Sequence, residues 1–458
     1  MTLQNKIKEV PGLAYVVESM ELMSAAGRRR MLEQPLLTSL ELLRQEQETV
    51  AILRQRIEST TYSQPLVVLR HQLMQLHDLR TTLSSLQSHF MLDEVELFEI
   101  KNLAFLCHHS RKALAEMHLD TLLVLPDLTE VFQLLDPDNT GIPNFYIYDS
   151  YDNRLAPLRR QMKQADDKLM GELLAEQNEI QQEVIVRLCD QLHAHADRLT
   201  QALDEMAYID FSLARATLAQ QWGLHQPDNT SAQPLLQGLF NPRLKQHNES
   251  LGLRYQPIDI ELTQGVTLVT GANMAGKTVL LKSIGVAQLM YQFGFAVPAT
   301  VAQLEPVDDV VFCIGDEQNE MNGLSSYAAE ITRISDVMHR SESERLLILI
   351  DEPARTTNPV EGKALVQAIA TIMGQRDSIT MITTHYSQLG VNCRRLRVRG
   401  FVESLSDMPI TAQTINRFID YSLILDNSDE VPHEALRIAE LLNCHPELIR
   451  QAKQFLLP

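Results

Sequence analysis

The sequence predicts an α plus α/β protein, in which an all-helical first half precedes a half with a mostly parallel sheet. Helices are expected first because apolar residues recur every three or four positions, as in SLELLRQEQETVAILRQRIE at 39–58. Three short apolar runs come later, VTLVT at 266–270, LLILI at 346–350 and ITMIT at 379–383, and they alternate with helical segments. A polar, turn-forming stretch at 221–234 separates the two patterns. We therefore expect a helical domain over 1–225 and an α/β domain over 226–458.

Length, charge and cysteine content narrow the class of protein. A chain of 458 residues is too long for one hydrophobic core, which favours two or three domains. The net charge of −19 opposes a surface that binds nucleic acid throughout. Five cysteines without a CxxC pair predict free thiols, with neither a disulfide framework nor a zinc site. The N-terminus lacks the apolar core of a signal peptide and LLILI is too short to cross a bilayer, so we expect a cytoplasmic protein without a membrane partner.

Two segments of the first half have an unusual composition. The arginine run in GRRRMLEQPLL at 27–37 favours a solvated helix face, where runs of like charge usually lie. The stretch 136–156 is rich in Asp, Asn, Pro, Gly and Tyr, and it predicts a short loop or hairpin. A calcium loop is rejected there, because Thr140 and Ile147 stand where oxygen ligands are preferred.

A long helical arm is expected next, with an outgoing helix near 157–177 and a returning helix near 178–220. Between 157 and 205 the chain has ten acidic residues against six basic ones, so the arm is acidic. In HAHAD at 193–197, His193 and Asp197 share one helical face, but a metal ion would need further ligands from another helix. A solvated helix face is the favoured interpretation.

The first apolar run of the second half leads into a glycine-bracketed loop. Gly271, Ala272, Asn273, Met274, Ala275, Gly276, Lys277 and Thr278 satisfy the pattern GxxxxGK[ST], between an expected strand and an expected helix. Glycines let successive backbone N–H groups turn toward phosphate oxygens, and the following helix adds its positive N-terminal end. Lys277 is expected to neutralise phosphate charge, and Thr278 to hold Mg²⁺ through its hydroxyl. The loop predicts a nucleotide site that includes Mg²⁺.

The other two apolar runs deliver polar side chains at their ends. Asp351 and Glu352 follow LLILI, at the edge of a parallel sheet where ligands of α/β proteins bind. Asp351 is expected to contact Mg²⁺, and Glu352 to polarise the water that attacks the γ-phosphate. His385 lies just beyond the third run, where it is a candidate for contact with the γ-phosphate or with that water.

These elements, in this order, resemble the ATPase domain of the MutS family, whose fold is of the ABC type. The resemblance extends over TGANMAGKTVLLKSIGVAQLMYQFGFAVPA at 270–299, IGDEQNEMNGLSSYAAEITRI at 314–334 and DEPARTTNPVEGKAL at 351–365. GDEQ and NPVEG are most similar to the bacterial paralogues that act on recombination or on stalled ribosomes. Upstream, GRRRMLEQP, IYDSYDNRL and EMAYIDFSLARATLA resemble the core and lever segments, and residues 421–453 resemble the helices that close the dimer.

The resemblance implies further roles. Asn273 would lie beside the phosphates, His385 would sense the γ-phosphate, and Tyr255 matches an aromatic residue that stacks on adenine. Ser325 matches the signature serine, which contacts the γ-phosphate bound to the partner subunit. Two chains would then complete two sites, so the resemblance implies a homodimer.

The sequence also departs from the family. Compared with the family, we expect this protein to lack the mismatch-reading domain, the C-terminal nuclease-type domain and most of the clamp that holds duplex DNA. CRRLRVRG at 393–400 is the densest basic cluster of the second half, and a strand with exposed arginines is favoured over a phosphate site. Three functions stay open: an ATP-driven switch on DNA, remodelling of a protein client such as a cobalamin-dependent aminomutase, and a structural dimer with little turnover.

Overall fold

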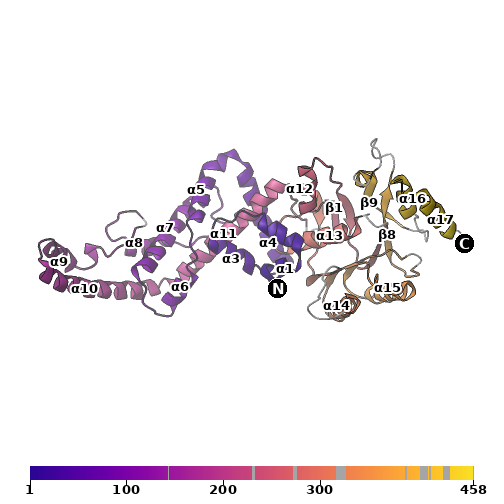
Figure 1. The fold of residues 1–458 in the computed structure, drawn as a ribbon. Helices are drawn as coiled ribbons and strands as arrows, with labels where there is room; N and C mark the ends of the chain where they lie inside the picture. The colour runs from indigo at the N-terminus through magenta and orange to yellow at the C-terminus, as the bar shows by residue number, and fades with distance from the viewer. Residues whose placement is uncertain are drawn as a thin grey trace.

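The computed structural model describes residues 1–142, 144–228, 233–271, 276–315, 326–386, 389–402, 411, 414–426 and 434–456. The molecule is elongated, with the helical first half at one end and the sheet-containing half at the other (Figure 1). The described residues are consistent with the expected α plus α/β class. Among them no helix is long and apolar enough to cross a membrane, and all five cysteines are free thiols.

Helices make up the described part of the first half. They are α1 (Leu3–Glu9), α2 (Pro11–Glu18), α3 (Ala25–Glu33), α4 (Leu40–Glu58), α5 (Ser63–Met74), α6 (Arg80–Gln87), α7 (Glu94–Glu116), α8 (Thr129–Leu135), α9 (Leu155–Met162), α10 (Asp167–His193) and α11 (Ala196–Trp222), with short 3-10 turns at Thr60–Tyr62 and Asp149–Tyr151. The described residues of 136–154 form a loop with the 3-10 turn at Asp149–Tyr151 and no strand, and α9 begins at Leu155.

The arm differs from the expected division near residue 177. Its outgoing helix is the short α9, and the chain has already turned when α10 begins at Asp167. The side chain of Asp166 fixes this start, because its Oδ1 accepts a hydrogen bond from the N–H of Leu169 at 2.9 Å. α10 and α11 then return toward the sheet almost end to end (Figure 1), interrupted at Ala194 and His195, within the HAHAD segment.

The arginine run lies on α3, and a buried carboxylate holds the start of that helix. Asp210 on α11 accepts hydrogen bonds from the N–H groups of Met23 and Ser24 and from the Ser24 hydroxyl. A Cβ atom at Gly27 would lie 2.1 Å from Asp210 Oδ2, so only glycine allows this approach. Arg29 then pairs with Asp78 at 2.9 Å, whereas Arg28 is exposed, so the expected solvated face holds for part of the run.

The second half contains two sheets. Its elements are β1 (Leu235–Leu239), α12 (Pro242–Ser250), β2 (Ile258–Glu261), β3 (Gly265–Thr270), α13 (Lys277–Gln292), β4 (Val301–Gln303), β5 (Asp309–Ile314), α14 (Ser326–Arg340), β6 (Leu346–Asp351), α15 (Pro359–Met373), β7 (Ile379–Thr383), β8 (Arg394–Phe401), β9 (Ile419–Leu425), α16 (Glu434–Leu441) and α17 (Pro446–Leu456), with a 3-10 turn at Ile415–Phe418. The large sheet has the order β5-β6-β7-β3-β8-β9, and the small sheet β2-β1-β4. All neighbours in the large sheet are parallel except β8 and β9.

Both faces of the large sheet are covered, which explains the uninterrupted apolar runs. Leu347 and Leu349 of β6 face a core shared with α13, whereas Ile348 and Ile350 face a core shared with α14 and α15. Helices on two sides therefore leave the carboxyl ends of the strands as the place where polar side chains can meet (Figure 1).

The first two helices pack against the sheet-containing half. A Cβ atom at Gly12 of α2 would lie 2.7 Å from Val286 of α13, so the two helices approach closely. The ammonium group of Lys6, which is 3% exposed, pairs with Asp309 of β5 at 2.7 Å. Residues 3–18 thus share a core with the second half, and the division at residue 225 stays a prediction from chain order.

Candidate nucleotide site

Three neighbouring strands bring the predicted polar residues to one edge. Val269 of β3, Thr383 of β7 and Asp351 of β6 lie in a single register row across the sheet. The glycine loop follows β3 directly and the Asp-Glu pair closes β6, so parallel pairing alone places them side by side. This confirms the arrangement that the three apolar runs predicted.

Asp351 of β6 accepts hydrogen bonds from side chains of helix α13 and strand β7. The Thr278 hydroxyl, at the start of α13, donates to Asp351 Oδ2 at 2.6 Å. The Thr383 hydroxyl donates to the other carboxylate oxygen, Oδ1. Hydroxyl and carboxylate oxygens are the ligands that Mg²⁺ prefers, and two of them converge here from separate elements. The donor set therefore fits the predicted magnesium site.

Lys277 and Glu352 form the second pair of the edge. The ammonium group of Lys277 lies 3.2 Å from Glu352 Oε1 and donates to the carbonyl oxygen of Gly271 at 2.7 Å. Lys277 is 5% and Glu352 14% exposed. The two charges neutralise each other in a place with little water.

The N-terminus of α13 lies at the same edge. Its N-cap residue is Gly276, which takes a left-handed conformation at φ +74° and has no side chain that could cap the helix. The first N–H groups of a helix have no partner within it, and the helix dipole makes this end positive. An anion such as a phosphate would satisfy both properties.

The turn after Asp351 is conformationally strained. Glu352 and Ala354 are not glycines, yet both lie in the left-handed region, at φ +46° and +59°. The N–H of Glu352 donates to the hydroxyl and the carbonyl of Thr383. The N–H of Ala354 donates to Glu330 Oε1 at 3.1 Å. These bonds hold the strained turn in place, and with it the Glu352 side chain.

Glu330 was not identified from the sequence. It lies on α14, and burial raises the pKa of its carboxyl group. Nothing in the local pattern SSYAAEITRI distinguishes it from an ordinary helical glutamate. Only the contact with Ala354, which lies 24 residues further along the chain, reveals its position.

The aromatic candidates differ in how close they lie to the loop. The Tyr255 hydroxyl accepts a hydrogen bond from the N–H of Asn241 at 2.8 Å, and its half-buried ring packs against the core beside α13. A Cβ atom at Gly276 would lie 3.0 Å from the ring of Tyr421 on β9, so that ring rests against the end of the loop. Tyr421 is a second residue that the sequence did not single out.

His385 lies just beyond β7, as expected, with an exposed imidazole. Its ring lies against that of Tyr386 in a tilted arrangement, with centroids 4.3 Å apart. Ala272, Asn273, Met274 and Ala275 of the loop, and the signature residue Ser325, lie outside the described residues. Their roles stay predictions.

The basic segment at 393–400 is strand β8. Leu396 and Val398 point inward, while the arginines alternate with them. Arg394 pairs with Glu261 at 2.9 Å and Arg399 with Asp420 at 3.3 Å. These pairs agree with a strand whose arginines serve the surface of the fold. Within the described ranges, no group of three or more His, Cys, Asp or Glu residues could hold a metal ion.

Comparison with known proteins finds similarity to MutS proteins. Residues 267–457 match the family model described as MutS domain V. Similar proteins named "Endonuclease MutS2" occur in Agathobacter rectalis, with 34% identity over 230 residues, and in Symbiobacterium thermophilum, with 30% identity over 290 residues. The protein of that name from Halalkalibacterium halodurans is 36% identical over 219 residues. The matched part of the sheet-containing half is therefore similar to MutS domain V.

These matches have a limited extent. They cover 49%, 63% and 47% of this chain, but only 28%, 35% and 27% of the three relatives. The chain therefore spans about a third of the length of the MutS proteins that it matches. MutS domain V contains Lys277, Thr278, Asp351 and Glu352, whereas Tyr255 lies before the matched residues.

Proposed function

We propose that this chain is a member of the MutS family, that it binds ATP with Mg²⁺, and that it hydrolyses ATP at the edge formed by β3, β6 and β7. The observation that carries the proposal is the convergence of two pairs, Thr278 with Asp351 and Lys277 with Glu352, at the N-terminal end of α13. An oxygen pair suited to Mg²⁺, a buried cation and a helix N-terminus are together what a nucleoside triphosphate requires.

The ion pair suggests how the site responds to nucleotide. A phosphate competes with Glu352 for the ammonium group of Lys277, because both are anions that can accept its hydrogen bonds. Once released, the Glu352 carboxylate can accept a proton from the attacking water. Bound Mg²⁺ would neutralise phosphate charge beside Thr278 and Asp351. The fixed turn around Glu352 keeps its carboxylate near this position while the partner of Lys277 changes.

We further propose that the working unit is a homodimer with composite sites. The support comes from the family resemblance of the segment around Ser325, which would complete the site of the other subunit. Sedimentation with and without Mg²⁺ and ATP tests this. Dimer formation favoured by nucleotide is expected, and a monomer under both conditions contradicts it.

Phosphate release from ATP tests the proposed hydrolysis. We expect turnover that requires Mg²⁺ and stops when the metal is removed with EDTA, because the oxygens of Thr278 and Asp351 at this edge are suited to the metal. Phosphate release that continues unchanged in EDTA would contradict the proposed site. Absence of release, with tight ATP binding, would leave a structural dimer.

The molecule on which the switch acts is a separate question. The family role favours DNA, whereas two features of the chain favour a protein client. α10 carries six acidic residues, Asp167, Glu172, Glu176, Glu179, Glu183 and Asp190, against two basic residues, Lys168 and Arg187. Two arginines of β8 are engaged with carboxylates. A surface that follows DNA phosphates needs cations that are available to exchange for counterions.

Gel-shift titrations distinguish DNA from a protein client as the molecule on which the switch acts. Duplex, mismatched and branched DNA are compared at low and at raised salt. With a protein client, no retention of any of these DNAs is expected even at low salt. Retention that weakens steeply as salt rises would instead assign the switch to DNA.

A further inference from the structure

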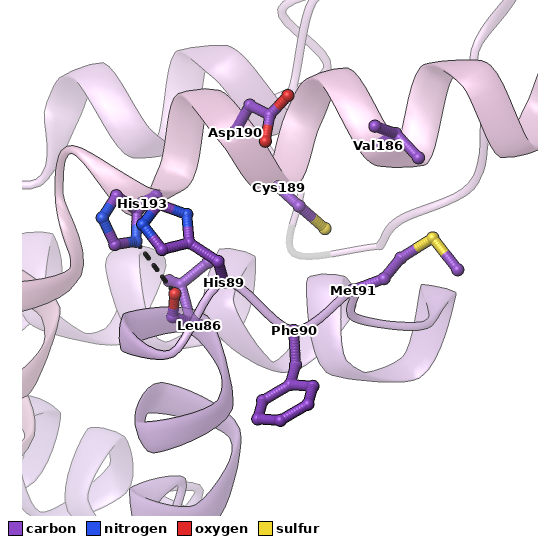
Figure 2. Close-up of a pocket in the computed structure, with 8 residues that line it drawn as sticks. All are labelled: Leu86, His89, Phe90, Met91, Val186, Cys189, Asp190 and His193. Carbon is purple, nitrogen blue, oxygen red and sulfur yellow. Dashed lines mark hydrogen bonds between the residues drawn. The ribbon is translucent and has the colours of Figure 1, made fainter.

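A small pocket lies between the turn after α6 and one face of α10, far from the nucleotide site. It has a volume of about 80 Å³ and is lined by Leu86, His89, Phe90, Met91, Val186, Cys189, Asp190 and His193. Figure 2 shows the rings of His89 and His193 side by side, with Phe90 and Met91 extending outward from the turn. The four residues from α10 have the spacing of one helical face.

Large apolar side chains around this pocket are exposed to solvent. The exposed fractions are 66% for Phe90, 58% for Met91 and 47% for Val186. Three such side chains at one rim are a feature of binding surfaces, because soluble proteins seldom expose neighbouring large apolar groups without a use. We call Phe90, Met91 and Val186 the α10 patch.

The turn presents this patch in a fixed conformation. α6 ends in a Schellman motif, in which the N–H of Phe90 donates to Ser85 O at 2.9 Å and the N–H of His89 to Leu86 O at 3.1 Å. His89 supplies the left-handed residue of the motif, at φ +58°. On the other side of the turn, the N–H of Leu92 donates to the sulfur of Cys189 at 3.4 Å.

The start of α7 also holds the turn in its conformation. Asp93 and Glu96 form a capping box there, which fixes the backbone directly after the patch. His193 adds a hydrogen bond between its Nδ1 and the carbonyl of Leu86, at 3.0 Å. A partner would therefore meet side chains whose backbone is already ordered, and binding would cost little loop entropy.

The surroundings of the patch are acidic. Burial raises the pKa of the Cys189 thiol, and the nearby carboxylates of Asp190 and Glu96 raise it further. Asp197 accepts a hydrogen bond from Gln87, next to the pocket, at 3.3 Å. Arg198 of α11 is paired with Glu130, and Arg187 of α10 donates to the carbonyl oxygen of Tyr151.

We propose that the α10 patch is a docking site for a protein segment with one large apolar side chain flanked by lysine or arginine. The apolar side chain enters the pocket, and the cations face Asp190, Glu96 and Asp197. Nucleic acid is disfavoured because its phosphates would meet carboxylates. A second copy of this chain is disfavoured because a two-fold contact would bring the same acidic rim against itself. The proposal is independent of the nucleotide site.

Fluorescence anisotropy with a defined probe tests the proposal. The probe is a labelled peptide of lysine and leucine with one central tryptophan, and its twin has glutamate at every lysine. We expect the lysine peptide to bind and the glutamate twin not to bind. Phe90→Ser combined with Val186→Ser should weaken binding about tenfold or more, and Asp190→Asn should weaken it less and reduce its salt dependence.

The control is Val124→Ser, because Val124 is equally exposed, at 58%, and lies in the helical half away from the pocket. Thermal unfolding midpoints should not change in any variant, since all the replaced side chains are exposed. If the lysine peptide binds the double variant as tightly as the wild type, the peptide is attracted by bulk charge and the proposal is overturned. The same holds if Val124→Ser weakens binding as much as the double variant does. Equal binding of the glutamate twin would overturn it as well, and so would a labelled DNA duplex that loses affinity in the double variant.

Discussion

The two ends of helix α13 differ in the partners of their backbone groups. At its N-terminus, the N-cap residue is Gly276, which has no side chain to cap the helix and takes a left-handed conformation. At its C-terminus, the backbone groups have partners from three directions. Gly294, at φ +79°, closes a Schellman motif, in which the N–H of Phe295 donates to Met290 O at 2.8 Å.

The helical half supplies the other partners of the C-terminal end. Arg215 of α11, a fully buried side chain, donates to Gly294 O at 3.0 Å and pairs with Glu46 of α4 at 2.5 Å. Gln47 of α4 donates to Phe295 O at 2.9 Å. Cations and donors at a helix C-terminus complement its partial negative charge.

This difference shows how the two halves of the molecule are connected. The N-terminus of α13 lies at the proposed nucleotide site, whereas its C-terminus is hydrogen-bonded to α4 and α11, the helices of the first half. A rigid helix of sixteen residues therefore lies between the nucleotide edge and α11. Substitutions at its two ends should consequently separate ligand binding from stability.

The largest effect is expected from Lys277→Met, which removes the cation of the N-terminal end. ATP affinity should fall about a hundredfold or more, because a buried charge-assisted contact with phosphate is lost. Titration with a fluorescent ATP analogue measures this. The control is Lys282→Met, which changes an exposed lysine of the same helix. Comparable losses in both variants would contradict the assignment.

Arg215→Met should affect the C-terminal end instead. Glu46 would lose its partner in the protein interior, and the free energy of unfolding should fall by about 3–5 kcal/mol. Urea denaturation measures the change. Arg198→Met is the matched variant, since Arg198 is 50% exposed in its pair with Glu130, and it should cost less than about 1 kcal/mol. Equal stability of both variants would break the comparison.

Glu330→Ala should lower kcat about tenfold and leave the KM for ATP nearly unchanged. The reason is that the bond to Ala354 orders the turn that carries Glu352 and makes no contact needed for binding. Glu330→Gln should lower kcat less than Glu330→Ala does, because the amide oxygen of glutamine can still accept the hydrogen bond from the N–H of Ala354. Asp336→Ala, at an exposed position of α14, is the control. A change confined to KM would be the opposite result.

The smallest effect is expected from Tyr421. Tyr421→Ala removes the ring that rests against Gly276 and should raise the KM for ATP about threefold, since the loop backbone becomes less ordered before binding. Tyr421→Phe keeps the ring and should behave as wild type. Steady-state kinetics distinguish the two, and a loss of equal size in Tyr421→Phe would assign the effect to the hydroxyl.

The parts of this site that could be predicted are those with local signals. The apolar runs gave strands β3, β6 and β7 with nearly the observed bounds, and each run delivered its polar residue at the shared edge. A run of buried aliphatic side chains followed by charged ones has few other structural solutions in an α/β protein. Lys277, Thr278, Asp351 and Glu352 were found for this reason.

Other features depend on contacts between distant segments. Glu330, Tyr421 and Arg215 have no unusual neighbours in the sequence, and only packing brings them to the turn, the loop and the end of α13. The division of the arm near residue 177 was wrong because the N-cap at Asp166 gave a weaker signal than the helical periodicity on either side. Propensity does not decide such boundaries when tertiary packing favours one register.

The most direct test of the account compares ATP binding and phosphate release in Glu352→Gln. The amide cannot accept a proton from water, so phosphate release should fall about a hundredfold or more. ATP should still bind within a few-fold of wild type, because Lys277 and the N-terminal end of α13 are unchanged. A variant that hydrolyses ATP at the wild-type rate would contradict the role given to this edge of the sheet.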